Sequence, residues 1–167
     1  MAQNNSFNMP LSIGSTRSIV KPSQICFAAY CSANVPNRTG NSVYNSVPFN
    51  SVFFNIGSHY DTGTVTFTAP VAGVYYFGSY VTFYNIGAAN TNCTLALYST
   101  PQLCDDSYSY PTQVKTPANE YTVSASAIIK MAVGNTVYCR VIVVGGTQTV
   151  GIKGLAGNSM FYGYLMA

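Results

Sequence analysis

Residues 60–84 read YDTGTVTFTAPVAGVYYFGSYVTFY, and this stretch decides the fold class. Two of its segments, residues 64–68 and 74–84, are rich in β-branched and aromatic side chains, which favour β-strands. The corner Ala-Pro-Val-Ala-Gly lies between them, and proline and glycine interrupt regular strand pairing. The stretch therefore predicts two strands joined by a tight corner.

The second of these strands is apolar on both of its sides. A strand with one side in water alternates apolar and polar residues, because successive side chains point to opposite faces. One side of residues 74–84 carries Tyr75, Phe77, Val81 and Phe83. The other side carries Val74, Tyr76, Tyr80 and Tyr84. Both sides therefore need a cover, and we expect another copy of the chain to cover the second side.

The composition is unusual in its low charge. A length of 167 residues suits one domain with a hydrophobic core. Charged residues make up 7% of the chain, against about 25% in average soluble proteins. The hydrophobic fraction of 48% excludes a disordered chain. The surface must therefore consist mainly of Asn, Ser, Thr, Gly and Tyr. This composition favours a rigid all-β particle held together through large interfaces.

Several classes of partner are not expected. The seven cations are scattered and form no basic run, which disfavours nucleic-acid binding. No segment approaches 18 continuous apolar residues, so no membrane insertion is expected, and no cysteine spacing indicates a metal site, so no cofactor is expected. The first residues lack the apolar core of a signal peptide. Either the chain stays in the cytoplasm until assembly or lysis, or its N-terminus was trimmed.

Five cysteines leave two alternatives open. Cys26 and Cys139 lie in strand-like runs and are expected to be small buried hydrophobic side chains. Cys93 and Cys104 are spaced so that a disulfide across a hairpin is the alternative.

The chain divides into a leader and one domain. Residues 1–23 show no hydrophobic period and are expected to be an extended leader or stalk connection, whereas residues 24–167 form the domain. Short strand-like segments separated by turn residues follow, which is typical of a sandwich or barrel without helices. The expected strands are residues 25–32, 47–56, 64–68, 74–84, 93–99, 121–131, 136–144, 149–153 and 159–166. Residues 102–119 are polar and proline-rich and are expected to form a long loop.

Alternation within these strands assigns residues to a core or to an interface. Tyrosine recurs on the second side of three strands, and it suits interfaces because it joins a large apolar body to a polar tip. The predicted interface residues are Val74, Tyr76, Tyr80, Tyr138, Arg140, Met160, Tyr162 and Tyr164. The predicted core residues are Phe27, Phe67, Tyr75, Phe77, Val137, Val141, Phe161 and Leu165.

Four motifs, in order, resemble the globular heads of the complement-component-1q and tumour-necrosis-factor superfamily. They are VPFNSVFFNIGSHYD at residues 47–61, TGTVTFTAPVAGVYYFGSYV at 62–81, IIKMAVGNTVYCRV at 128–141 and SMFYGYLM at 159–166. The second motif matches the family signature at Gly63, Phe67, Pro70, Gly73, Tyr75 and Phe77. The third has Asn135 where the family usually has aspartate. The resemblance covers roughly residues 24–167.

This resemblance implies a fold and a mode of assembly. The implied fold is an all-β, ten-stranded jelly-roll sandwich that forms a compact homotrimer. Its inner sheet makes the trimer contacts and is expected to contain the strands that begin near residues 25, 74, 136 and 159. Members of the family bind targets and are not expected to be enzymes.

The resemblance also suggests a location. Such heads occur in secreted proteins, on spore filaments and in phage and viral fibres, and residues 21–37 look like the opening of a fibre head. Low charge, the absence of a signal peptide and the polar uncharged surface favour the receptor-binding tip of a phage or viral fibre. The expected partner is an unknown cell-surface glycan or protein receptor, met on a virion fibre or outside the cell after release. The alternatives are a secreted soluble recognition protein and a purely structural trimerisation cap.

Few residues are suited to chemistry. His59, the only histidine, precedes Asp61 in a turn, and a turn stabilised by local hydrogen bonds is favoured over a catalytic triad. Asp105 and Asp106 suggest either a solvated loop or a calcium site at a trimer apex. Tyr108 and Tyr110 join them in a possible ligand loop. Residues 86–92 and 144–149 are the other candidate binding loops, since loops carry most binding sites.

Overall fold

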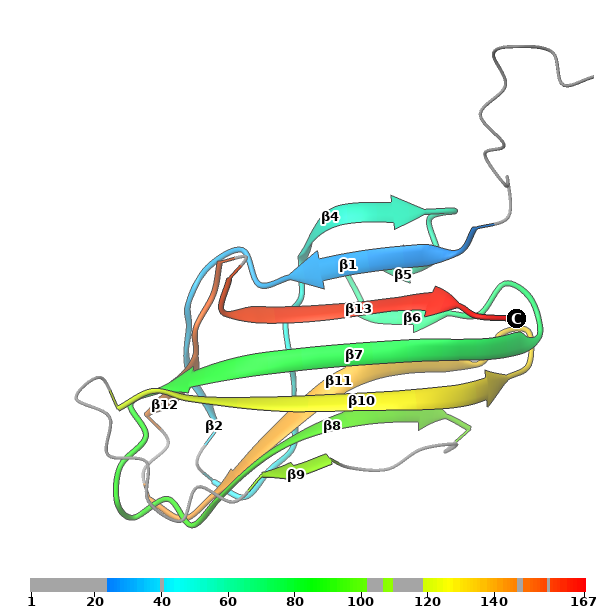
Figure 1. Ribbon diagram of the computed structural model, residues 1–167. Coiled ribbons are helices and arrows are strands. Elements are labelled where there is room, and N and C mark those ends of the chain that lie inside the picture. Colours follow the sequence, from blue (N-terminus) through cyan, green and yellow to red (C-terminus); the bar gives the residue numbers. More distant parts are fainter. Residues whose placement is uncertain (1–23, 40, 102–106, 110–118, 147–148, 156) are drawn as a thin grey trace, which may run out of the picture.

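The computed structural model describes residues 24–39, 41–101, 107–109, 119–146, 149–155 and 157–167, and in this part of the chain all regular structure is β (Figure 1). The strands are β1 Cys26–Tyr30, β2 Val35–Thr39, β3 Asn45–Ser46, β4 Ser51–Ile56, β5 Tyr60–Asp61, β6 Thr66–Thr68, β7 Gly73–Tyr84, β8 Asn92–Thr100, β9 Ser107–Ser109, β10 Tyr121–Met131, β11 Thr136–Val144, β12 Val150–Ile152 and β13 Ser159–Leu165. Since the described residues form no helix, none of them provides a helix that spans a membrane.

The strands form two antiparallel sheets. The front sheet has seven strands in the order β2-β12-β7-β13-β1-β4, with β10 also paired to β7. The back sheet has six strands in the order β5-β6-β11-β8-β9, with β3 also paired to β11. Figure 1 shows β4, β1, β13, β7 and β10 side by side, with β8 and β11 behind them. The two sheets enclose one core, which makes the domain a β-sandwich.

Aromatic rings fill the centre of this core. The ring of Phe27 lies 4.7 Å from that of Tyr60, 5.2 Å from that of Phe67 and 4.9 Å from that of Phe161, measured between centroids. Seven of the predicted core residues are at most 1% exposed: Phe27, Phe67, Tyr75, Phe77, Val137, Val141 and Phe161. Leu165 is partly buried and packs against this cluster. Strands from both sheets supply these side chains, so the core holds the two sheets together.

The strand count and one sheet assignment differ from expectation. The described residues form thirteen strands rather than ten, and β3 and β5 contain two residues each. β9 lies within the stretch expected to be a loop, and β2 contains Pro36, which an edge strand tolerates because its N–H is not needed for pairing. The strand that begins at Thr136, β11, was expected beside β1, β7 and β13, but it lies in the back sheet. That expectation, which followed from the family resemblance, was wrong, because β11 pairs with β3, β6 and β8 and with no strand of the front sheet.

The described cysteines are free thiols. Cys31, Cys93 and Cys139 are buried and Cys26 is half-buried. Cys93 therefore forms no hairpin disulfide. The predicted burial holds for Cys139, whereas Cys26 is only half-buried. Burial raises the pKa of the Cys31 and Cys93 thiols from 9.0 to about 12. Burial also raises the pKa of Tyr60, whose hydroxyl donates a hydrogen bond to the carbonyl of Phe49 at 2.9 Å.

We expect the free energy of unfolding to fall steeply between about pH 9 and pH 12. In this range the unfolded chain releases protons from Cys31 and Cys93 while the folded chain retains them, so alkali favours unfolding. Each such group lowers the free energy of unfolding by about 1.4 kcal/mol per pH unit. Urea unfolding at a series of pH values measures the slope. The variant Cys93→Ala should show a shallower slope than the wild type, and an equal slope would contradict this explanation.

Candidate subunit interface

The outward side of the front sheet is rich in aromatic side chains and is here called the tyrosine face. The face consists of the outward side chains of β1, β4, β7, β10 and β13, on the side away from the core. Antiparallel register fixes its cross-strand pairs, which are Tyr76–Tyr164, Gly78–Tyr162 and Tyr80–Met160. The side chains of Tyr76, Tyr80, Met160 and Tyr162 are half-buried within one chain, and Tyr164 is exposed. The face is thus a wide, largely aromatic surface that this chain leaves partly uncovered.

Glycines allow two tyrosine rings to lie across neighbouring strands. A Cβ atom at Gly78 would lie 2.5 Å from Cζ of Tyr162, so the ring occupies the space that a side chain would need. A Cβ at Gly151 would likewise collide with the ring of Tyr84. Burial raises the pKa of Tyr162, and the neighbouring phenol of Tyr76 adds to this shift. The rings of Tyr162 and Tyr84 thus fill the space that the two glycines leave on the sheet.

The variant Gly78→Ala is expected to weaken self-association while leaving the sandwich folded. The added methyl group must displace the ring of Tyr162 away from the sheet, because that ring now occupies its place. We expect the dissociation constant of the oligomer to rise at least tenfold, as measured by sedimentation equilibrium. Gly157→Ala is the matched control, since a Cβ at position 157 meets nothing within 4 Å. Equal association of both variants would mean that the position of Tyr162 does not matter.

Strand β4 contributes phenylalanines to this face, and these residues were not predicted from the sequence. The register between β1 and β4 shifts between Ala28 and Ala29, and Phe53 has no Cα partner on β1 as a result. Its ring lies 4.7 Å from that of Tyr30. Phe53 is 55% exposed and Phe54 is 47% exposed. The sequence signal is the same as in β7. Apolar residues occupy consecutive positions of the strand, so both of its faces are apolar.

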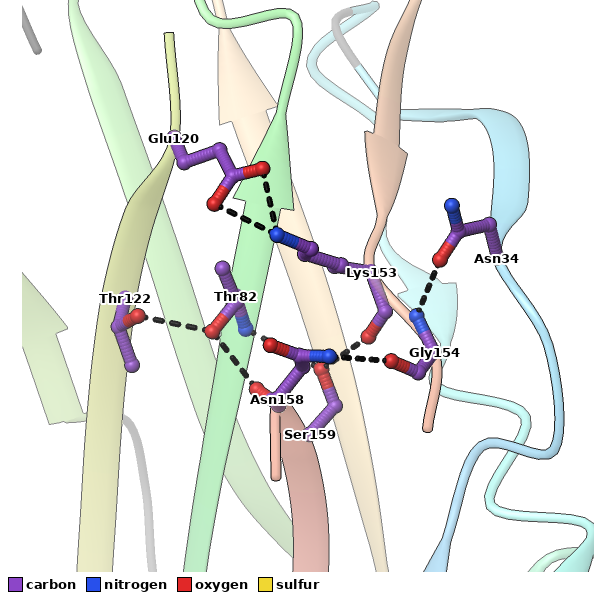
Figure 2. A network of polar contacts seen from close by, with 8 residues as sticks. All are labelled: Asn34, Thr82, Glu120, Thr122, Lys153, Gly154, Asn158 and Ser159. Carbon is purple, nitrogen blue, oxygen red and sulfur yellow. Dashed lines mark hydrogen bonds and ion pairs between the residues drawn. The ribbon is translucent and has the colours of Figure 1, made fainter. Parts of the chain in front are cut away.

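Polar contacts close one end of the tyrosine face (Figure 2). Lys153 Nζ lies 2.7 and 2.9 Å from the two carboxylate oxygens of Glu120. The hydroxyl groups of Thr82 and Thr122 are 2.8 Å apart, and the Thr82 hydroxyl donates to the carbonyl of Asn158 at 2.7 Å. These contacts join the end of β7 and the start of β10 to the loop that leads into β13. The loop is thereby held against the sheet.

Two predicted interface residues, Tyr138 and Arg140, lie elsewhere. Both belong to β11 in the back sheet, so they do not share a face with Tyr76 or Tyr162. The guanidinium of Arg140 lies 4.0 Å from the ring centre of Tyr44 and 4.2 Å from that of Tyr98. This cation–π stacking fixes the arginine against its own sheet. The expectation that they lie in the same sheet as Tyr76 and Tyr162 was therefore wrong.

The turn around His59 is a structural element. The Asp61 carboxylate accepts hydrogen bonds from the backbone N–H of Gly63 at 2.8 Å and from the hydroxyl of Thr64 at 3.0 Å. These bonds, with that of Gly63 first, hold the pKa of Asp61 below its usual value. The carboxylate therefore stabilises its own turn. Among the residues described here, no three His, Cys, Asp or Glu side chains gather in a cluster able to hold a metal ion.

The predicted ligand loop lies mostly outside the described residues. Asp105, Asp106 and Tyr110 fall there, together with the suggested calcium site. Tyr108 belongs to β9, where its backbone pairs with Thr94.

Two other candidate loops are joined to each other. The Asn90 side chain donates to the carbonyl of Gly145 at 2.7 Å and accepts from the N–H of Gly87 at 2.8 Å. The N–H of Thr91 donates to the carbonyl of Val144 at 2.8 Å. These loops lie at the end of the sandwich opposite Ala167 (Figure 1). They form a surface that is separate from the tyrosine face.

Together these features define an all-β sandwich with an aromatic outward face and joined loops at one end. The sequence profile of the C1q domain matches residues 27–166, and the chain belongs to the C1q domain family. Among solved structures, the globular domain of a zebrafish complement 1qA protein is similar with a TM-score of 0.54 and 16% sequence identity, covering 86% of this chain and 98% of that one. At this identity the similarity concerns the fold. C1q domains are generally non-enzymatic recognition modules that form trimers, and proteins that carry them are typically extracellular.

Proposed function

We propose that this chain is a non-enzymatic binding head that works as a homotrimer. The observation that carries the proposal is the tyrosine face, which is too large and too aromatic to remain exposed in a protein with so little charge. Exposed apolar surfaces of this kind mark contacts with other proteins. Tyrosine is enriched in interfaces, whereas a charged surface would keep a monomer soluble. The proposed interface residues are Val74, Tyr76, Tyr80, Met160, Tyr162 and Tyr164, without Tyr138 and Arg140.

A mass measurement in solution tests the assembly. Chains of 17.9 kDa should sediment as a species of three chains at micromolar concentration. A stable monomer at that concentration would overturn the proposal, and a stable dimer would require a different arrangement of the tyrosine face.

The proposed target site is the loop end of the sandwich. In a trimer joined through the tyrosine face, the loops around Asn90 and Gly145 remain outside the subunit contacts. Three copies of these loops would face one direction, so several weak contacts would add up to a stronger one. We propose a cell-surface glycan or protein as the target. Glycan-array and cell-binding measurements with the trimer test this, and Asn90→Ala should reduce binding because it removes the side-chain bond to Gly145 in the other loop and the bond to Gly87 in its own.

We further propose that the head sits at the tip of a phage or viral fibre. A charged fraction of 7% and a surface rich in uncharged polar residues support this location. The start of β1 and the C-terminus also lie at the end of the domain opposite the loops, so a fibre attached there would point the loops outward (Figure 1). Electron microscopy with an antibody against the domain tests the location. Label at free fibre ends of virus or phage particles would support it, and a soluble protein in the medium would contradict it.

A further inference from the structure

We infer that Leu155 is a central contact residue of the loop end and that the target bound there is a protein with an apolar pocket. This inference rests on the proposed function and names the chemistry of the target at the same site. Leu155 lies in the loop between β12 and β13, and β13 begins at the end of the domain opposite the C-terminus (Figure 1). Its side chain is 62% exposed.

The backbone of Leu155 has an unfavourable conformation. Its φ angle is 70°, in the left-handed region that glycine and asparagine adopt far more readily than leucine. A single exposed apolar side chain needs no explanation by itself. Here, however, the backbone is strained at a side chain that the domain leaves mostly in water. Strained residues of this kind gather at binding sites, which indicates a role for the leucine in binding.

Hydrogen bonds hold the backbone of Leu155 on both sides. Its N–H donates to the carbonyl of Cys31, at the end of β1, at 2.8 Å. Its carbonyl accepts from the N–H of Asn158 at 3.1 Å. The strained conformation is therefore fixed by contacts with a second loop and with the start of β13.

The preceding residue, Gly154, is held as firmly. Its N–H donates to the side chain of Asn34 at 2.8 Å, and its carbonyl accepts from the side-chain amide of Asn158 at 2.7 Å (Figure 2). A Cβ atom at Gly154 would collide with the backbone of Ala33, so the two loops are in direct backbone contact. The position of Leu155 is thus set before any partner binds, and this lowers the entropy cost of binding.

The residues around Leu155 favour a protein target over a glycan. The charges of Lys153 and Glu120 compensate each other in an ion pair of 2.7 Å. A leucine side chain offers no hydrogen-bond donor or acceptor to the hydroxyl groups of a sugar, whereas it fits an apolar pocket in a protein. The exposed residues beside it in the two loops are small and uncharged: Ser32, Ala33, Asn34 and Gly157.

The variant Leu155→Asn tests the inference, because asparagine has nearly the shape of leucine and tolerates the left-handed backbone but is polar. The labelled head is titrated onto intact cells that bind the wild type. The same cells are also used after surface proteolysis or after periodate oxidation of their surface glycans. We expect proteolysis to abolish binding and periodate to leave it intact. Leu155→Asn should weaken binding by roughly tenfold or more, with the mass and melting temperature of the wild type.

Two control variants make the result specific. Leu155→Met keeps an apolar side chain and should bind nearly as well as the wild type. Val65→Asn makes an apolar-to-polar change at another positive φ angle, 52°, in the turn between β5 and β6 at the edge of the back sheet. This variant should bind like the wild type, since the turn lies away from the loop end.

Three results would overturn the inference. Equal binding of Leu155→Asn and the wild type would show that the target makes no apolar contact with this residue. Binding that survives proteolysis but is lost after periodate would identify a glycan. A Leu155→Asn protein without the three-chain mass would make Leu155 a subunit contact. A wild-type head that binds no cell would instead remove the proposed binding function, so the failures are distinguishable.

Discussion

Replacing Tyr162 by lysine is expected to turn the trimer into folded monomers or to make the protein insoluble. The Tyr162 ring lies across Gly78, and its centre is 6.3 Å from that of Tyr76, in the middle of the tyrosine face. A lysine there places an ammonium group inside the proposed interface without a carboxylate to pair with. A buried charge without a partner costs about 3–5 kcal/mol, and it recurs in each of three subunits. Sedimentation equilibrium measures the mass.

Two control variants make this result specific. Val133→Lys introduces the same charge at a side chain that is 65% exposed in the turn between β10 and β11, and the trimer should persist. Tyr162→Phe keeps the ring and removes only the hydroxyl, so association should weaken far less than with lysine. A Tyr162→Lys protein that remains a soluble trimer would show that the tyrosine face is not the contact surface.

Replacing Phe27 by alanine is expected to cost a large part of the stability of the domain. Phe27 is 1% exposed and its ring contacts Tyr60, Phe67 and Phe161. Removing a buried phenylalanine ring destabilises a protein by about 3–5 kcal/mol, against a total of about 5–15 kcal/mol for a typical domain. For a domain of this size the melting temperature should fall by roughly 6–20 °C. Thermal unfolding followed by circular dichroism, at one fixed chain concentration, measures the change.

Phe54→Ala is the matched control because it makes the same chemical change at a side chain that is 47% exposed. The monomer fold should survive this change, and the weakened property should be self-association. The pair of variants separates core packing by a phenylalanine of β1 from the proposed subunit contact of a phenylalanine of β4. If Phe27→Ala melted within a degree or two of the wild type, the aromatic cluster would not be the centre of the core.

The two surfaces of the head have different physical requirements. The tyrosine face uses regular strands, which hold side chains in a fixed register and give a broad rigid contact. The loop end is held by a few hydrogen bonds, such as those of Asn90, and tolerates change in the residues between them. If the tyrosine face is the subunit contact and the loop end the target site, as proposed, residues of the loops can change without altering the assembly.

Much of the strand pattern was predictable because it depends on local chemistry. Residues 121–131 and 136–144 form strands with the expected bounds, since each run of β-branched and aromatic residues ends at glycine, asparagine or proline. The short strands β2, β3 and β5 were not predicted, because tertiary pairing rather than propensity holds two to five residues extended. The shift in register that brings Phe53 against Tyr30 likewise depends on the contact between β1 and β4.

The all-β class, the family motifs and the two faces of each strand can be predicted from the amino-acid sequence alone. Tyr75 and Tyr76 must point to opposite sides of β7 whatever lies next to it, because side chains alternate along an extended backbone. Only the tertiary structure decided which strands are neighbours. It placed Tyr138 and Arg140 on the back sheet and Phe53 and Phe54 on the edge of the front sheet, since strand order arises from hydrogen bonds between segments far apart in the chain.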